Sequence, residues 1–261
     1  MRDMTRREWI TATGVGALGL ALGAARAEVQ PVAPEGMILI PGGMFLTGTS
    51  VEQVEELARK YGYHPSWFSG ETPQAHVNLQ AFVIDKYPVT NAQFAEFCAA
   101  TGHARRPYWN GPEPPPRLAE HPVAMVNQAD CTAYAQWAGK RLPTEEEWEK
   151  AARGTDGRMF PWGEEFDPEA CQWNRARAPV TFATAPATAH PSGASPYGVM
   201  DMVGNVAEYC ADGPGPGAAF IKGGSWMNEE IVNLRPAARN MSGFANNAAT
   251  FYGFRCAKDV V

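Results

Sequence analysis

The sequence predicts a single α+β domain in which regular helices and strands are sparse. Three observations favour this fold class. The chain is 261 residues long, which is the upper end of the range for one domain. Its 26 glycines and 22 prolines interrupt helices and strands, so much of the chain is expected to be loop. Its 8 tryptophans are large rings that fill irregular gaps between loops.

Composition and charge exclude several classes of partner. Hydrophobic residues make up 45% of the chain and charged residues 19%, which is typical of a globular protein. The formal net charge is −6, and basic clusters such as Arg105-Arg106 are short. Because nucleic acids and anionic membranes are bound through extended basic surfaces, neither is an expected partner.

The N-terminus predicts a cleaved export leader. Arg6 and Arg7 precede a weakly apolar segment, and Ala25-Arg26-Ala27 places small residues where a signal peptidase cuts. This arrangement resembles a twin-arginine signal. A retained anchor is the alternative, but Trp9 to Ala25 is short for a spanning helix. We therefore expect a periplasmic protein without membrane association after cleavage, divided into a leader (1–27), a linker (28–34) and a folded domain (35–258).

The first elements are predicted from alternation and helical periodicity. Alternating apolar residues around Gly42-Gly43 predict a hairpin over residues 37–50. Apolar positions at helical spacing predict a short helix over residues 51–60. Residues 76–90 alternate again and are expected to form strands.

The next helix is predicted from its ends. Thr90 is a suitable N-cap, Phe94 and Phe97 line one face of the segment that follows, and Gly102 ends it. Residues 105–117 are rich in proline and predict a loop.

Two more helices follow. The first is expected to end at Trp137, because Gly139 follows two residues later. The second begins after Thr144, which forms a capping box with Glu147. The acidic run 145–147 lies in the first turn, where the helix dipole favours negative charge, so it predicts a helix start and no catalytic role. After residue 159 the pattern is one of short strands and turns.

Seven short blocks of sequence resemble one known family. They are IPGGMFLTG (40–48), VTNAQFAEF (89–97), GKRLPTEEEWEKAARG (139–154), FPWG (160–163), YGVMDMVGNVAEYCAD (197–212), KGGSW (222–226) and GFRCA (253–257). In this order they are similar to the formylglycine-generating enzyme, or sulfatase-modifying factor, family. The resemblance implies that family's fold, a C-type-lectin-like variant with little regular structure.

The resemblance also implies a chemistry whose reactive groups are replaced in this chain. In members that convert a substrate cysteine to formylglycine, two cysteines after Gly-Gly-Ser-Trp hold copper(I) and activate oxygen. The matching positions here are Asn228 and Asn233. Thiolates are soft ligands that favour Cu(I), whereas a neutral amide is a poor ligand for it. Copper is therefore not expected, and a true formylglycine-generating oxidase is the least favoured function.

An iron centre has no support in the sequence. Iron-dependent relatives of the fold bind their metal through histidines, largely from an additional helical domain. The histidines of this chain have no metal-ligand spacing. They are His64, His76, His103, His121 and His190.

The segment after Gly-Gly-Ser-Trp is nevertheless the candidate site. A glutamate in a partly buried cleft can have a raised pKa suited to general-base catalysis, and asparagines can both donate to and accept from a peptide backbone. The candidate catalytic residues are Ser225, Glu229 and Glu230, and the candidate substrate-binding residues are Trp226, Asn228 and Asn233.

Two interpretations of this site stay open. In the first, the protein is an atypical oxidoreductase or maturation factor that acts on a peptide, protein or small molecule without the copper centre. In the second, it is a non-catalytic accessory or binding protein, resembling the accessory proteins encoded beside copper nitrite reductases. The residues after Gly-Gly-Ser-Trp do not separate the two.

The resemblance further implies a structural calcium site. The family's second calcium site takes oxygen ligands that match the Asp201 side chain, the Gly204 and Val206 carbonyls, and the Glu208 carboxylate. Such a set suits a hard cation with flexible oxygen coordination.

A further calcium site is doubtful. Asn174 and the Arg175 carbonyl fit the family's first site, but Pro179 stands where an aspartate ligand is expected. Losing a charged ligand would weaken that site.

The cysteines form no redox or zinc motif. They are five in number, so at least one is unpaired, and no two form a C-x-x-C pair. Family members often tie the C-terminal block to the helix before WAGKRLP. A disulfide between Cys131 and Cys256 is an open alternative that geometry must decide. The other thiols are Cys98, Cys171 and Cys210.

Overall fold

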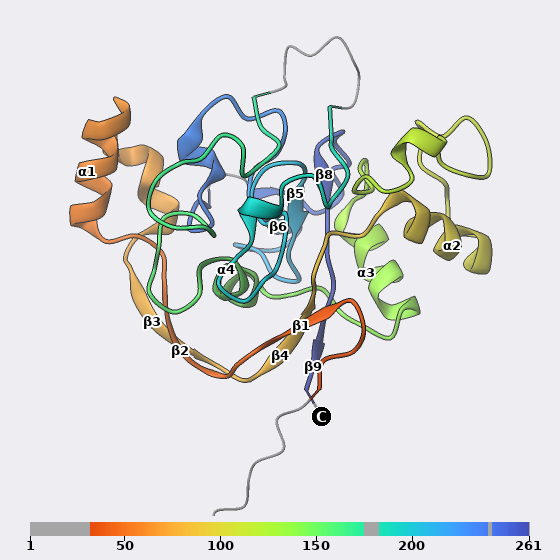
Figure 1. Ribbon diagram of the computed structural model, residues 1–261, viewed down its shortest axis with the longest axis horizontal. Helices are drawn as coiled ribbons and strands as arrows, with labels where there is room; N and C mark the ends of the chain where they lie inside the picture. Colours follow the sequence, from red (N-terminus) through yellow and green to blue (C-terminus); the bar gives the residue numbers. More distant parts are fainter. Residues whose placement is uncertain (1–31, 175–182, 240–241, 261) are drawn as a thin grey trace, which may run out of the picture. The chain divides into compact units, whose positions relative to one another are not determined.

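The computed structural model describes residues 32–174, 183–239 and 242–260 (Figure 1). Short helices and strands joined by long loops confirm the predicted mixed α and β class. The predicted leader and Arg175 lie outside the described residues. Within these ranges, no helix is both long and apolar enough to cross a bilayer.

The N-terminal strands, together with the C-terminal strand β9, form two antiparallel sheets. One is a three-stranded sheet of order β1-β4-β9, and the other pairs β2 with β3. The strands are β1 (Met37–Ile40), β2 (Gly43–Thr47), β3 (Ala75–Leu79), β4 (Phe82–Asp85) and β9 (Ala257–Asp259).

The hairpin predicted over residues 37–50 is wrong. β1 pairs with β4 and β2 pairs with β3, so the two strands do not pair with each other. At the junction, the carbonyls of Pro41 and Gly43 accept hydrogen bonds from Lys150 Nζ, at 2.7 and 2.9 Å. A Cβ on Gly42 would lie 3.0 Å from the backbone nitrogen of Ala81. The Gly-Gly sequence therefore allows one extended chain to pass from the first ladder to the second.

The helices begin where their caps predict. Ser50, Thr90 and Thr144 each accept a hydrogen bond from the third residue of the following helix and complete a capping box. The α-helices are α1 (Val51–Tyr61), α2 (Asn91–Thr101), α3 (Gln128–Trp137) and α4 (Glu145–Arg153). The 3-10 helices are η1 (Pro65–Glu71), η2 (Pro116–Leu118), η3 (Pro191–Gly193) and η4 (Ile231–Leu234).

A second sheet carries the C-terminal blocks. Its order is β7-β6-β5-β8, with β5 and β8 parallel and the other pairs antiparallel. In Figure 1, α1 lies on one side of β5 and β6, and α2 and α3 lie on the other. The strands are β5 (Ala207–Tyr209), β6 (Ala218–Lys222), β7 (Ser242–Phe244) and β8 (Tyr252–Gly253).

Two parts of the core position the candidate site. Trp148 of α4 is fully buried in a cluster with side chains of β1 and β4 and with Met202. A smaller cluster joins α1 and η1, through Leu57 and Phe68, to Val232 of η4. A Cβ on Gly223 would lie 3.0 Å from the Trp148 ring, so the segment that follows β6 approaches α4 at its start and the α1–η1 unit at Val232.

Candidate functional site

The candidate segment starts with two glycines whose backbone requires glycine. Gly223 and Gly224 have φ angles of 87° and 65°, which L residues with side chains rarely adopt. A Cβ on Gly223 would lie 2.6 Å from the carbonyl oxygen of Met202. A Cβ on Gly224 would lie 2.8 Å from the carbonyl oxygen of Asn233. The segment from 224 to 233 therefore closes on itself and brings the two asparagine positions close to the same glycine.

Asn228 closes a turn that begins at Ser225. Its backbone N–H donates to the Ser225 carbonyl at 3.1 Å. Its side-chain Oδ1 accepts from the Ser225 backbone N–H at 2.7 Å and from Ser225 Oγ at 3.2 Å. Among the described residues, no acceptor is bonded to Asn228 Nδ2. The amide oxygen is thus structural, while the amide nitrogen is left as a donor.

Ser225 and Trp226 are buried behind this turn. The Ser225 hydroxyl also accepts from the Met227 N–H at 3.3 Å, so it is engaged on both sides. Trp226 is 4% exposed, and its backbone N–H donates to the Asn205 carbonyl at 3.0 Å. Its indole Nε1–H has no acceptor in the part of the chain that is described. A buried donor without an acceptor is costly, so this position favours a ligand or water oxygen.

The two glutamates are less enclosed than the general-base argument requires. Glu229 and Glu230 are both exposed, whereas that argument expected a partly buried cleft. The Glu230 carboxylate accepts a hydrogen bond from the hydroxyl of Tyr63, which follows α1. The Glu230 carbonyl also accepts from the Asn233 N–H at 3.1 Å. The structure therefore places Glu230 at a surface contact with α1 and η1.

No cysteine takes the place of the missing thiol pair in this segment. All five cysteines are buried free thiols on other elements, so Cys131 and Cys256 are not joined in this structure. Burial raises the pKa of Cys171 to about 12 and also raises the pKa of Cys98. These thiols are protonated at neutral pH, and the thiolate is the form that binds soft metals.

The predicted calcium loop turns at Asp201. This residue has a φ of 58° and is buried, and its Oδ2 accepts from Asn205 Nδ2 at 2.7 Å. Burial raises the pKa of Asp201 to about 7. A Cβ on Gly204 would lie 2.5 Å from the Gln172 carbonyl oxygen, so the loop at this position requires glycine.

Glu208 already has cationic and neutral partners. Its Oε2 accepts from Trp148 Nε1 and Arg255 Nε, and its Oε1 accepts from Arg255 Nη2, each at 2.7 Å. The Arg255 guanidinium also donates to the carbonyls of Met200 and Asp201. Oε1 keeps one acceptor position, so Glu208 can ligate a cation through that oxygen only.

The predicted ligands therefore differ in how well they suit a calcium ion. The carboxyl of Asp201 and the carbonyls of Gly204 and Val206 are hard oxygen donors of the kind calcium binds. Glu208 is mainly the partner of Arg255. For the doubtful site, Asn174 is exposed, and its backbone N–H donates to the Asn228 carbonyl at 3.0 Å.

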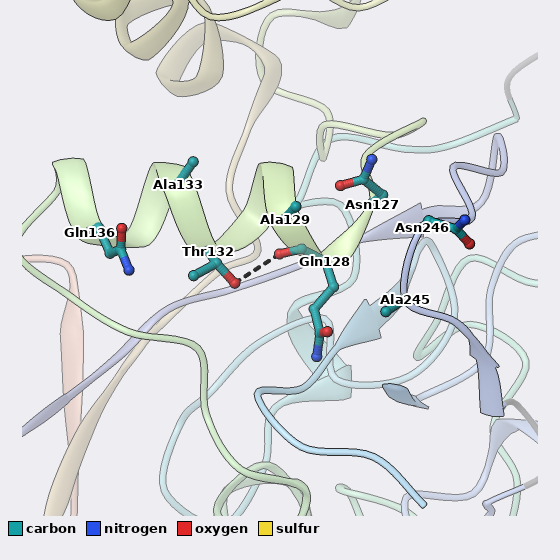
Figure 2. Close-up of a pocket in the computed structure, with 8 residues that line it drawn as sticks. All are labelled: Asn127, Gln128, Ala129, Thr132, Ala133, Gln136, Ala245 and Asn246. Carbon is teal, nitrogen blue, oxygen red and sulfur yellow. Dashed lines mark hydrogen bonds between the residues drawn. The ribbon is translucent and has the colours of Figure 1, made fainter. Parts of the chain in front are cut away.

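The surface cavities along α3 are lined by other residues. Figure 2 shows a cavity of about 430 Å³ between α3 and residues 245–246, where Thr132 donates to the Gln128 carbonyl. A neighbouring cavity of about 530 Å³ includes Trp137 and His103. The first is lined by amides and small side chains, and the second adds aromatic rings and the imidazole of His103, which contacts Asp130.

The fold and the Gly-Gly-Ser-Trp turn are those of a formylglycine-generating-enzyme-like domain. Residues 23–260 match the family described as "Sulfatase-modifying factor enzyme 1-like domain", and the chain belongs to this family. It is 34% identical to the formylglycine-generating enzyme of Thermomonospora curvata, over 90% of this chain and 96% of that protein. It is 33% identical to the formylglycine-generating enzyme of Streptomyces coelicolor, over 90% of this chain and 94% of that protein.

A solved structure shows a similar fold. PvdO from Pseudomonas aeruginosa superimposes with a TM-score of 0.66 at 25% identity, and the match covers 85% of this chain and 94% of that chain. CarF superimposes with a TM-score of 0.58 at 18% identity, which shows the fold alone.

Sequence reasoning missed the residues that face the segment from elsewhere in the chain. Tyr63 contacts Glu230 across 167 positions of sequence. Arg255 was within a recognised block, yet no local pattern pairs it with Glu208. Long-range partners of this kind leave no periodic or spacing signal in one sequence.

Proposed function

We propose that this protein is a maturation or accessory factor of the family that binds a polypeptide client at residues 225–233. The observation that supports the proposal is that the oxygen and the nitrogen of the Asn228 side-chain amide have different roles. Its oxygen closes the turn at Ser225, and its nitrogen is a donor suited to a peptide carbonyl. The neighbouring residue, Trp226, has a buried indole N–H without an acceptor among the described residues.

A redox role without the copper-thiolate pair is the second candidate. The relatives named formylglycine-generating enzyme favour it, because their identity to this chain extends over nearly its whole length. The candidate catalytic set for that role remains Ser225, Glu229 and Glu230. Oxygen-uptake measurements on the purified chain separate this candidate from a purely binding role.

Substitutions at Asn228 test the client-binding proposal. Asn228→Asp keeps an oxygen for the Ser225 turn and removes the amide donor, so stability should be nearly kept while client affinity falls about two- to tenfold. Asn228→Ala removes the turn-closing oxygen and should cost about 1–2 kcal/mol of unfolding free energy. The client probe is a peptide selected from a phage-displayed random heptapeptide library on the wild-type chain.

The matched pair keeps this test decisive. Urea unfolding measures the stability of both variants, and calorimetric titration measures the affinity of the selected peptide. Equal peptide affinity for Asn228→Asp and wild type would show that the amide nitrogen does not bind the client. Failure to select any peptide would contradict client binding itself.

We also propose export to the periplasm and removal of residues 1–27. The paired arginines and the small residues before Glu28 support this location. Mass analysis of the chain recovered from a periplasmic extract tests it. An intact leader on a protein found only in the cytoplasm would contradict the proposal.

Calcium is the proposed structural cofactor, with no role for copper or iron. Asp201, Gly204 and Val206 would hold the ion, and Glu208 would contribute through Oε1. A bound ion would fix the loop that supplies the Asn205 carbonyl to Trp226, which links calcium to the site. A cation beside the Asp201 carboxylate would also offset the free-energy cost of burying that negative charge.

Calcium binding should raise the stability of the wild-type chain. At a free calcium concentration one hundred times Kd, the expected gain is about 2.7 kcal/mol. Asp201→Ala should lose this gain, whereas Asp156→Ala, which removes an exposed carboxylate, should keep it. Thermal unfolding of each variant is compared in calcium and in excess chelator, so that each protein is its own reference. Equal melting temperatures for the wild type in both buffers would contradict a calcium site.

A further inference from the structure

A stacked pair of aromatic rings, the half-buried Tyr63 and the exposed Trp67, borders the proposed client site. Tyr63 and Trp67 stack with ring centroids 4.9 Å apart and an interplanar angle of 29°. Trp67 is 46% exposed, which is high for a side chain of this size. Large exposed aromatic surfaces beside polar groups mark interaction sites more often than isolated apolar residues do.

The ring pair is fixed to the candidate segment. Tyr63 packs against the cluster that contains Phe68 of η1 and Val232 of η4. Its hydroxyl donates a hydrogen bond to the Glu230 carboxylate. Buried contacts and a polar contact therefore hold the rings beside the segment that binds the client in our proposal.

The charges around the ring pair favour a positively charged ligand group. The segment from 225 to 234 contains Glu229 and Glu230 and no basic residue. Several basic side chains near the segment are paired with carboxylates, as Lys60 with Glu165, Arg235 with Glu71 and Arg239 with Glu145, whereas Arg59 of α1 is exposed. The Tyr63 hydroxyl donates to a carboxylate, which increases electron density in the ring and strengthens its attraction for a cation.

We propose that Tyr63, Trp67 and Glu230 form a subsite for a cationic side chain of the client polypeptide. This inference rests on the proposed client binding and names the chemistry that the neighbouring subsite accepts. The indole face and the Tyr63 ring attract the cation through their π systems, and Glu230 supplies the opposite charge. The turn at Ser225 and Asn228 binds the client backbone.

The test is a peptide selection against three forms of the full chain. Phage-displayed random heptapeptides are selected on the wild type, on Trp67→Ala and on Trp137→Ala. Trp137 is a matched control because it is 43% exposed and lies on α3, which lines a separate cavity. We expect lysine and arginine to be enriched in peptides selected on the wild type and on Trp137→Ala. That enrichment should disappear on Trp67→Ala.

Affinity measurements give the size of the effect. Replacing the enriched basic residue of a selected peptide by glutamine should weaken binding to the wild type about two- to fivefold, the range of an exposed cation–π contact. Glu230→Gln keeps both aromatic rings and should reduce the difference in affinity between the basic peptide and the glutamine peptide. Equal affinities of the basic and glutamine peptides would overturn the subsite. Equal loss of basic enrichment in Trp67→Ala and Trp137→Ala would overturn it too.

A failure of the client-binding proposal can be distinguished from a failure of the cation subsite. If no peptide is selected on any form, the client proposal fails, and n-butylamine then probes the rings directly. A shift of the Trp67 indole resonance on adding n-butylamine, with Trp137 unchanged, would keep a cation site for a small amine and reject the polypeptide source. Unchanged indole resonances would overturn the cation site as well.

Discussion

Replacing Glu208 by glutamine is expected to lower the free energy of unfolding by about 3–5 kcal/mol, because it leaves the buried Arg255 guanidinium without its counter-charge. The side chains of Glu208 and Arg255 are 1% and 0% exposed. Three N–H donors converge on the carboxylate, and a glutamine can accept from only part of this set. Urea unfolding in chelator measures the effect without any contribution from calcium.

A more exposed ion pair provides the control for this prediction. Glu147 is bidentate with Arg141, whose side chain is 35% exposed, so Glu147→Gln should cost at most about 1 kcal/mol. If Glu208→Gln costs no more than Glu147→Gln, then Glu208 is not the main partner of Arg255. The usual calcium-ligand role would then be the better account of Glu208.

Glu149→Gln is expected to have a similarly large effect. The Glu149 carboxylate accepts from Lys222 Nζ at 3.2 Å, from Arg153 Nη1 at 2.7 Å and from the Gly48 N–H at 2.8 Å. Both oxygens are buried, and Lys222 is fully buried as well. Removing one negative charge leaves excess positive charge in the interior, which should cost about 3–5 kcal/mol. Asp156→Asn, at the more exposed pair with Arg158, is the control and should cost at most about 1 kcal/mol.

The same carboxylate should make the fold sensitive to acid. Burial opposes its ionisation, but the charges of Lys222 and Arg153 hold the pKa of Glu149 below its usual value. A carboxylate with a lowered folded-state pKa stabilises the fold above its unfolded-state pKa, and this contribution is lost as pH falls through the folded-state value. The stability difference between wild type and Glu149→Gln should therefore shrink below pH 4.5. A difference that stays constant down to low pH would contradict this assignment.

Helix ends were predictable because their signals are local. Thr90 and Thr144 act through hydrogen bonds to residues three positions away, so one sequence contains the whole interaction. The separate partners of β1 and β2 were not predictable in the same way. They depend on Lys150 of α4 and on the approach of Ala81, both distant in sequence.

The position of the candidate site was predictable from the sequence, but the burial and the contacts of its side chains were only partly predictable. The Gly-Gly-Ser-Trp block located Ser225 and Asn228, and the structure shows that the asparagine closes the turn. The general-base argument expected a partly buried cleft around Glu230, and the resemblance to the family implied that Glu208 is a calcium ligand. The actual partners, Tyr63 and Arg255, come from other elements and could be found only from the folded chain.

The central claim is that amides, and not a thiol-bound copper ion, define the chemistry of residues 225–233. The most direct test loads the purified chain with Cu(I) in the presence of excess glutathione and measures bound copper and oxygen uptake with a cysteine-containing peptide. We expect no copper retained at stoichiometric level and no peptide-dependent oxygen uptake. One copper per chain together with oxygen uptake that Asn228→Ala abolishes would contradict it.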